Sequence, residues 1–291
     1  MISSLLVNVI GIVVFAIVAP VLGCLLGGLD RVISARMQGR VGPPILQPYY
    51  DVRKLLAKDN VSTNGAESIY VTTALVFANI AGGIFYSGGN ILLSIFLVTM
   101  GALFFIIAAY SSRSPYAEIG ANREIMQVMA YEPMVLILAV GFFMASGTFN
   151  VGDLFSIDYP IICKAWIIFI GLLFILTIKL RKSPFDISMS HHAHQEIVRG
   201  MTTEMSGPTL AKVEVMHWVE NVLFLGWVGM FFIWSNPLSI VLAIVVAFLA
   251  FFLEILIDNN FARVKWQAML KSAWIVALVT GVVNIALLMF M

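Results

Sequence analysis

Long apolar stretches alternate with short polar segments along this chain. Eight apolar stretches, each bounded by charged or turn residues, cover residues 5–27, 68–87, 90–110, 124–146, 160–180, 217–234, 237–257 and 273–291. A helix needs about 20 apolar residues to cross the hydrocarbon core of a bilayer, whereas outer-membrane strands alternate polar and apolar residues. The pattern therefore predicts an all-α polytopic membrane protein, with eight transmembrane helices in a single domain over residues 1–291.

The polar residues concentrate in four longer loops. An eight-helix count places all four on one side of the membrane, at 28–67, 111–123, 181–216 and 258–272. All but one of the 17 Lys and Arg residues lie in or beside these loops, and Lys164 is the exception. Because cytoplasmic loops carry the excess of Lys and Arg, we expect the long loops in the cytoplasm and both termini outside.

Composition narrows the function classes. Hydrophobic residues make up 60% of the 291 residues and charged residues 11%, against about 25% charged residues in soluble proteins, so a soluble fold is excluded. With a net charge of +1 we expect the lipid membrane and no nucleic acid as a partner. The sequence has no phosphate-binding loop, dinucleotide fingerprint, CxxC pair or intramembrane His pair suited to haem. We therefore expect this chain to hold no cofactor or metal. It would act as the partner of a protein that carries out redox chemistry.

The first long loop combines positive charge with glycine and proline. Its glycines permit tight backbone turns, and its proline stiffens the residues after it. We expect the two arginines of this loop to bind an acidic surface of a partner. The residues concerned are Arg36, Gly39, Arg40, Gly42 and Pro43. Residues 47–58 then have the pattern of an amphipathic helix lying in the membrane interface. The alternative is that these cations only anchor the loop at the cytoplasmic face.

The entrance to the fourth span is rich in polar residues. If it is helical, Arg123, Gln127 and Tyr131 share one face at i, i+4, i+8 spacing. Glu132 comes next and enters the membrane ahead of Pro133. A buried charge there costs at least about 2.5 kcal/mol unless it is protonated, paired or hydrated. Glu132 is therefore a candidate proton carrier, and the alternative is a structural ion pair with Arg123.

Three histidines lie close together in the loop 181–216. His191, His192 and His194 stand beside Glu196, and His192 and Glu196 have the i, i+4 spacing that a zinc site can use. There is no second His at i+4, as the metalloprotease helix motif would have, and no Cys cluster. Titration near neutral pH at a proton entrance and contact with a partner protein are the other two interpretations, and we favour these over a metal.

More carboxylates lie within or near the predicted spans. Glu214 and Glu220 are six residues, or about 9 Å, apart on one helix, and His217 falls three residues from each. Ionisable groups inside a membrane are functional candidates by default, so this trio is expected to form a loose path along the helix. Glu254 is near the cytoplasmic end of its span, where it can snorkel, and is expected to be structural.

Several motifs in the same order resemble subunit 1 of respiratory complex I, called NuoH in bacteria. The resemblance runs from about residue 30 to residue 275. Its motifs are Arg36-Met-Gln-Gly-Arg-Val-Gly-Pro43, Gly120-Ala-Asn-Arg123 with Gln127 and Tyr131-Glu132, Arg181-Lys-Ser-Pro-Phe-Asp186, Glu196-Ile-Val-Arg-Gly200, Thr203-Glu-Met-Ser-Gly207 and Ala262-Arg-Val-Lys-Trp-Gln-Ala-Met269. The resemblance implies eight spans.

The chain departs from the respiratory pattern at two places, at residue 177 and after Pro184-Phe185-Asp186, where that pattern has further Glu residues and this chain has Ser188 to His194 with a few extra positions. That pattern has a Glu four residues before the arginine corresponding to Arg181, and here Thr177 stands there. The run from His191 to Glu196 and the stretch after it are similar to the B subunit of the Ech-type energy-converting hydrogenase, a group 4 NiFe enzyme. This branch is favoured, and a quinone site is placed in doubt.

The resemblance implies a non-catalytic membrane subunit in a prokaryotic cell (inner) membrane. The expected partners are hydrogenase large and small subunits, which would hold the NiFe centre and iron–sulfur clusters, a ferredoxin-like iron–sulfur subunit and an antiporter-like membrane subunit. This chain would dock the redox arm and couple proton reduction to H⁺ or Na⁺ translocation. The alternatives are a quinone-site subunit of a complex I-type enzyme and a stand-alone ion transporter.

The resemblance also assigns expected roles. Glu132 would be the central carboxylate of the ion path. Its feeders or continuations would be Glu196, Glu204, Glu214, Glu220 and His217. Arg181 would belong to the docking and positioning residues, and Asp186 with Arg123 would hold the loop.

Overall fold

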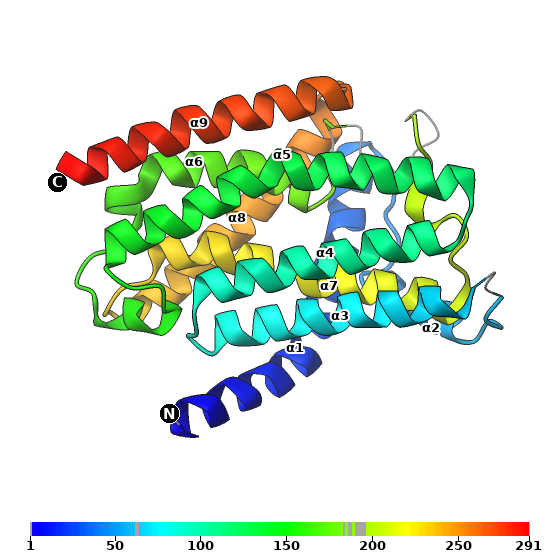
Figure 1. Cartoon of the computed structure of the whole chain (residues 1–291), viewed down its shortest axis with the longest axis horizontal. Helices are drawn as coiled ribbons and strands as arrows, with labels where there is room; N and C mark the ends of the chain where they lie inside the picture. The colour runs from blue at the N-terminus through cyan, green and yellow to red at the C-terminus, as the bar shows by residue number, and fades with distance from the viewer. Residues whose placement is uncertain (1, 62–63, 183, 186–187, 190–195, 291) are drawn as a thin grey trace.

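Helices account for the regular structure of the residues that this computed structural model describes, which are 2–61, 64–182, 184–185, 188–189 and 196–290. In chain order they are α1 (Ile2–Met37), α2 (Gln47–Leu56), α3 (Gly65–Tyr86), α4 (Ile91–Ser111), α5 (Pro115–Ser146), η1 (Val151–Ser156), α6 (Ile162–Lys179), η2 (Gly200–Thr202), α7 (Gly207–Gly229), η3 (Met230–Phe232), α8 (Leu238–Asn260) and α9 (Trp266–Phe290). Figure 1 shows the long helices packed side by side as a bundle.

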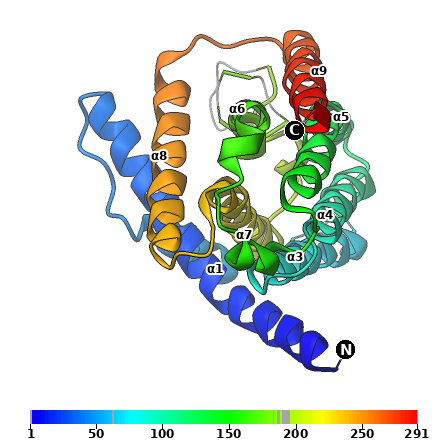
Figure 2. The same ribbon diagram turned by 90° about the vertical axis from the view of Figure 1, so that its left-hand side faces the viewer.

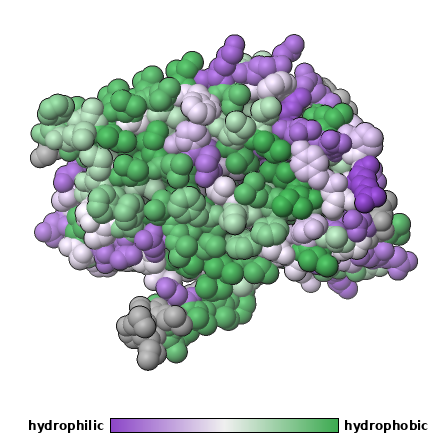
Figure 3. Space-filling model, in the orientation of Figure 1, coloured by the Kyte–Doolittle hydropathy of each residue, from purple (hydrophilic) through white to green (hydrophobic). Residues whose placement is uncertain are grey.

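Eight of these helices are long and apolar enough to cross a membrane, which confirms the predicted span number. In Figure 1 both termini lie toward the same end of the bundle, and α2 lies at the other end. A broad apolar band covers the middle of the surface in Figure 3, and hydrophilic residues gather most densely at the α2 end. This is the surface expected of a multi-pass membrane protein.

Several predicted boundaries were wrong, because helices continue beyond their apolar segments. α1 runs to Met37, ten residues past the predicted end at 27, and α5 starts at Pro115 instead of residue 124. At 1.5 Å per residue, the 36 residues of α1 span about 54 Å, against about 30 Å for a hydrocarbon core. Hydropathy reports where a helix enters lipid, whereas its hydrogen bonds continue into the polar end of the bundle.

The predicted amphipathic helix is α2. It buries Pro48 and Val52, while Tyr49 and Tyr50 are about half exposed. Asp51 on α2 accepts a hydrogen bond from Arg31 of α1 at 2.6 Å. Partial burial raises the pKa of Asp51, but hydrogen bonds and charges from its neighbours outweigh burial, so the pKa lies below its ordinary value. α2 is thereby fixed to the polar end of α1.

Close contacts between helices position α1. A Cβ on Gly23 would lie 2.4 Å from the backbone oxygen of Trp218, so only glycine lets α1 approach α7 this closely. Viewed along the bundle, α1 crosses beside α8, and its N-terminal half leaves the bundle (Figure 2). α1 contacts both α7 and α8, and residues of its polar half line a large cavity beside these helices.

Candidate functional site

Buried polar side chains from three segments gather around a small internal cavity. Its volume is about 20 Å³, which is room for about one water molecule. The polar residues that line it are Glu124, Gln127, Tyr131, Lys179, Arg181 and Glu220. They come from α5, the end of α6 and α7, so the site exists only because these helices pack together.

Three α5 residues line this cavity, and one of them differs from the predicted set: Glu124 takes the place of Arg123. Glu124, Gln127 and Tyr131, at i, i+3 and i+7, are each at most 5% exposed. Gln127 lies where its amide can donate to a Glu124 oxygen at 3.2 Å and accept from the Ser188 N–H at 2.8 Å. The Ser188 hydroxyl also donates to Glu124. Glu124, which was not among the residues predicted from the sequence, is therefore a principal acid of the site.

Arg181 stands at the centre of the site with an unusual backbone. Its φ of +57° is left-handed, a conformation that costs about 1–2 kcal/mol for a residue with a Cβ. It ends α6 in the manner usual for glycine, because its N–H bonds to the Ile178 carbonyl and the N–H of Lys182 bonds to the Thr177 carbonyl. The turn directs the Arg181 side chain back into the bundle.

The Arg181 side chain joins carboxylates from two helices. A guanidinium nitrogen lies 3.8 Å from Glu124 and 3.9 Å from Glu220. Another guanidinium nitrogen contacts the imidazole ring of His217, at 3.3 Å from Nδ1 and closer to Nε2. Arg181 thus connects α5 with α7 through charge.

Lys179, two residues earlier, supplies a second buried cation. Its Nζ lies 3.5 Å from the ring centroid of Tyr131 and 5.0 Å from that of Phe224. The carboxylates of Glu132, Glu220 and Glu124 all act electrostatically on this ammonium. Aromatic faces stabilise such a cation where water is excluded.

A second, much larger cavity of about 1070 Å³ opens toward the polar end of the bundle. Glu214, His217 and Glu220 of α7 all line it, as predicted for residues sharing one helix face. Lys179, Arg181 and Glu220 line both cavities. These three charged groups therefore lie between the two cavities.

Glu132 continues this arrangement toward α4. One of its carboxylate oxygens accepts a hydrogen bond from the Thr99 hydroxyl at 2.9 Å, and the other oxygen is buried with no hydrogen-bond partner among the described residues. Glu132 is thereby held against α4 through Thr99.

The inner site holds more acids than bases. Its three carboxylates are Glu124, Glu132 and Glu220, and its two cations are Lys179 and Arg181. Burying net charge in a low-dielectric interior is expensive. With every member ionised, these five groups together carry one more negative than positive charge.

Other predicted acids lie elsewhere. Glu196 is exposed and accepts a hydrogen bond from Arg123 at 2.9 Å, and Arg123 also lies over the ring of Trp266. The charge of Glu204 acts on Glu67 of α3. These two acids are at the outer loops, so the structure does not bring them into the central cluster.

Four predicted positions lie outside the described residues: Asp186, His191, His192 and His194. The expected contact between Asp186 and Arg123 thus stays a prediction. The ion pair between Arg123 and Glu196 joins α5 to the loop between α6 and α7, ten residues after Asp186.

The glycine-rich segment after α1 forms the tight turn that was predicted. Gly39 has a φ of +69° and ends α1, and a Cβ on Gly42 would lie 2.9 Å from Cα of Val32. Arg36 and Arg40 are exposed at this turn, and Arg40 donates to Gln38. Pro43 lies in the extended connection to α2.

Sequence reasoning missed Glu67 and misjudged the burial of Glu254. Both are fully buried, and in the regions that the structure describes neither has a hydrogen-bond partner for its carboxylate oxygens. The expectation that Glu254 snorkels was wrong, because α8 packs this position against neighbouring helices. Glu124 could have been found from its spacing, because residues three and seven positions apart on a helix, here Gln127 and Tyr131, share its face.

Known proteins resemble this chain over most of its length. A family model described as NADH dehydrogenase matches residues 9–289. Formate hydrogenlyase subunit 4 of Escherichia coli K12 is 27% identical, covering 93% of this chain and 94% of its own. Hydrogenase-4 component C of the same organism is 25% identical, covering 89% and 90%. The H subunit of the NADH-quinone oxidoreductase of Anoxybacillus flavithermus is 28% identical, covering 97% and 90%.

A solved structure shows the same fold. One chain of the membrane-bound sulfane sulfur reductase (MBS), an archaeal respiratory membrane complex, superposes with a TM-score of 0.83. The match covers 95% of this chain and 99% of that chain, at 22% identity. The architecture of eight spans is therefore one that also occurs within a respiratory membrane complex.

Proposed function

We propose, on the premise that this chain belongs to the NADH dehydrogenase family, that it is the membrane subunit of an energy-converting hydrogenase. It docks a peripheral redox arm and couples proton reduction to the translocation of H⁺ or Na⁺. Two relatives that it matches over most of its length are named as a formate hydrogenlyase subunit and a hydrogenase component.

One observation carries this proposal: acids and bases follow one another from the open cavity to the interior. Glu214, His217 and Glu220 line the large cavity, and Glu220 also borders the small one. Glu124 stands on the small cavity and Glu132 lies beyond it, against α4. Intramembrane ionisable groups that face an interior cavity are typical of ion pathways.

Charge balance gives these residues their roles. Arg181 holds Glu124 and Glu220 near one another, so moving a proton between them does not change the net charge of the cluster. Lys179 offsets the charge that develops on Glu132. A change in the docked arm that displaced Arg181 would leave its carboxylates without a counter-charge and draw in a proton.

The partners supply the redox chemistry. Hydrogenase large and small subunits would hold the NiFe centre and iron–sulfur clusters, beside a ferredoxin-like subunit and an antiporter-like membrane subunit. The arm would dock on the exposed turn with Arg36 and Arg40. This end of the bundle would face the cytoplasm, because it carries nearly all the Lys and Arg residues.

A quinone-reducing subunit is the second candidate, because the large cavity has room for a ring-sized ligand. One position argues against it. Thr177 stands where the respiratory pattern has a Glu, is 4% exposed, and donates its hydroxyl to the Phe174 carbonyl of its own helix. An acid of that pattern is thus replaced by a hydroxyl engaged within α6.

The experiment that tests the proposal is purification of the native complex in mild detergent through a tag on this chain. Nickel content and hydrogen evolution from reduced ferredoxin are then measured on the same sample. Nickel together with hydrogen evolution supports the proposal. Iron–sulfur partners without nickel, with quinone reduction, would favour the second candidate, and recovery of this chain alone would favour a stand-alone transporter.

A further inference from the structure

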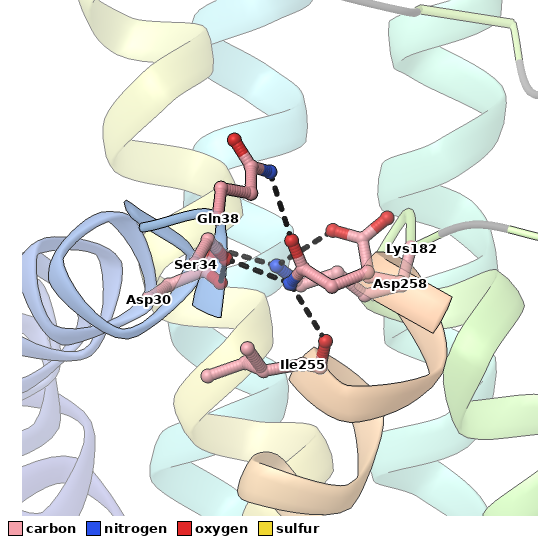
Figure 4. Close-up of polar contacts among 7 residues, drawn as sticks. Asp30, Ser34, Gln38, Lys182, Ile255 and Asp258 are labelled. Atoms are coloured by element: carbon pink, nitrogen blue, oxygen red, sulfur yellow. Dashed lines mark hydrogen bonds and ion pairs between the residues drawn. The ribbon is translucent and has the colours of Figure 1, made fainter. Parts of the chain in front are cut away.

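A second group of buried charges lies apart from the central cluster, where α1 meets α8. Lys182 follows α6 and donates to Asp30 of α1, and its Nζ is 3.7 Å from Asp258 of α8 (Figure 4). The Lys182 side chain is 11% exposed. One ammonium thus connects two helices that are far apart in the sequence.

Side-chain amides extend this contact by another turn. Asn259 of α8 donates to the Ser34 hydroxyl at 3.1 Å and to the Ile255 carbonyl at 2.8 Å, and Gln38 donates to Asn259 at 3.0 Å. Figure 4 shows these contacts bridging α1 and α8. The bridging side chains, which we name the α1–α8 clasp, are Asp30, Ser34, Gln38, Lys182, Asp258 and Asn259. All six line the large cavity.

Glu254 lies one helical turn before Asp258 on α8, so the two share a face. It is 0% exposed, and neither carboxylate oxygen has a hydrogen-bond partner within the described part of the chain. The charges of Lys182 and Asp258 both act on it. An ionised carboxylate without a single hydrogen bond is among the costliest groups to bury.

Among the described residues, the charges on the neighbouring elements leave Glu254 without a counter-ion of its own. Asp30 of α1 and Asp258 of α8 already share Lys182. On α7, Glu220 pairs with Arg181, and on α6, Lys179 lies over Tyr131. The group formed by Glu254, Asp30, Asp258 and Lys182 therefore has two more negative than positive charges when every member is ionised.

We propose that Glu254 is a proton-binding site, and that its proton keeps Lys182 in the α1–α8 clasp. With Glu254 neutral, Lys182 remains with Asp30 and Asp258. When Glu254 loses its proton, the new carboxylate attracts Lys182 away from Asp30 and loosens α1 from α8. A proton is favoured over a metal ion, because the described residues contain no group of three His, Cys, Asp or Glu placed to hold one.

The proton itself is tested by infrared spectroscopy on the native complex, purified through a tag on this chain. The spectrum of the wild type minus that of Glu254→Gln should show the C=O stretch of a protonated carboxyl, shifted in D₂O. Bands of an ionised carboxylate instead would overturn the proposal. A wild-type spectrum that changes on adding Na⁺ at constant pH, through bands missing in Glu254→Gln, would overturn it in favour of a cation.

A second variant keeps the test decisive if Glu254→Gln does not assemble. Glu254→Asp retains a carboxyl and should move the protonated band without removing it. An Asp variant whose difference spectrum contains only carboxylate bands would contradict the proposal in the same way.

The link to the clasp is tested by the distance between spin labels on α1 and α8. Met37 and Phe261 are both exposed beside the clasp and are replaced by labelled cysteines after Cys24 and Cys163 are removed. Raising the pH from mildly acidic to mildly alkaline should change this distance in the parent complex, and Glu254→Gln should abolish the change. A pH response that survives Glu254→Gln would overturn the link.

Glu67→Gln is the matched control, because Glu67 is equally buried and unpartnered but lies on α3. It should leave the pH response of the clasp intact. Neither measurement uses hydrogenase activity, so this inference and the proposed function can fail independently.

Discussion

At the scale of single residues, the site depends on a few charges whose partners come from other helices. Arg181 is the clearest case, because its strained backbone places a guanidinium between Glu124 and Glu220. Strain of this kind persists only where surrounding structure maintains it, and such positions cluster at functional sites. Glu132 is the complementary case, a carboxyl with one partner and one unpartnered oxygen.

Replacing Glu132 with Gln should abolish ion translocation and leave the complex assembled, because the amide keeps the bond to Thr99 but cannot exchange a proton. Ion uptake into inverted vesicles during turnover measures the effect. The control is Glu118→Gln, an exposed acid at the start of the same helix. A normal ion gradient in the Glu132 variant would remove Glu132 from the path.

Replacing Arg181 with Met should destabilise the complex by about 3–5 kcal/mol, because it leaves two buried carboxylates without their counter-charge. Thermal unfolding of the purified complex measures the loss. Adding Glu124→Gln to the Arg181 variant should restore part of the stability, since one uncompensated charge is then removed. If the double variant is no more stable than the single one, Arg181 does not act through Glu124.

At the scale of elements, α9 maintains a kink in α6. α6 leaves helical geometry at Ala165. There the Ile168 N–H donates to the Asn284 side chain of α9 at 3.1 Å, and the Asn284 amide donates to the Lys164 carbonyl at 3.0 Å. Asn284 thus replaces the bond that Ile168 and Lys164 would form in a regular helix, which accounts for the kink.

Asn284→Ala should destabilise the protein by about 1–3 kcal/mol, because it leaves a buried N–H and carbonyl without partners. Thermal unfolding in detergent measures this, and the exposed Asn260→Ala on α8 provides the comparison. Unchanged stability would mean that α6 closes its own hydrogen bond and that the kink is not imposed by α9.

At the scale of the whole molecule, eight spans and the charge distribution predict the orientation in the membrane. Cys163 is exposed near the start of α6, at the end opposite the long loops, whereas Cys24 is buried in α1. With the long loops in the cytoplasm, Cys163 lies outside.

A membrane-impermeant maleimide added to right-side-out vesicles should therefore label Cys163, and the label should disappear in Cys163→Ser. Labelling that requires permeabilised vesicles would show the opposite orientation. The buried Cys24 serves as an internal comparison within the same chain, and mass spectrometry of the labelled peptides distinguishes the two.

The span number, the amphipathic α2 and the turn at Gly39 could be predicted from the sequence, because hydropathy, periodicity and glycine spacing are local properties. The same local reasoning placed Glu214, His217 and Glu220 along α7. The pairing of Glu124 with Arg181 and the burial of Glu254 became visible in the folded chain alone. Burial and charge pairing depend on which helices meet, and contacts between distant segments leave no periodic signal in one chain.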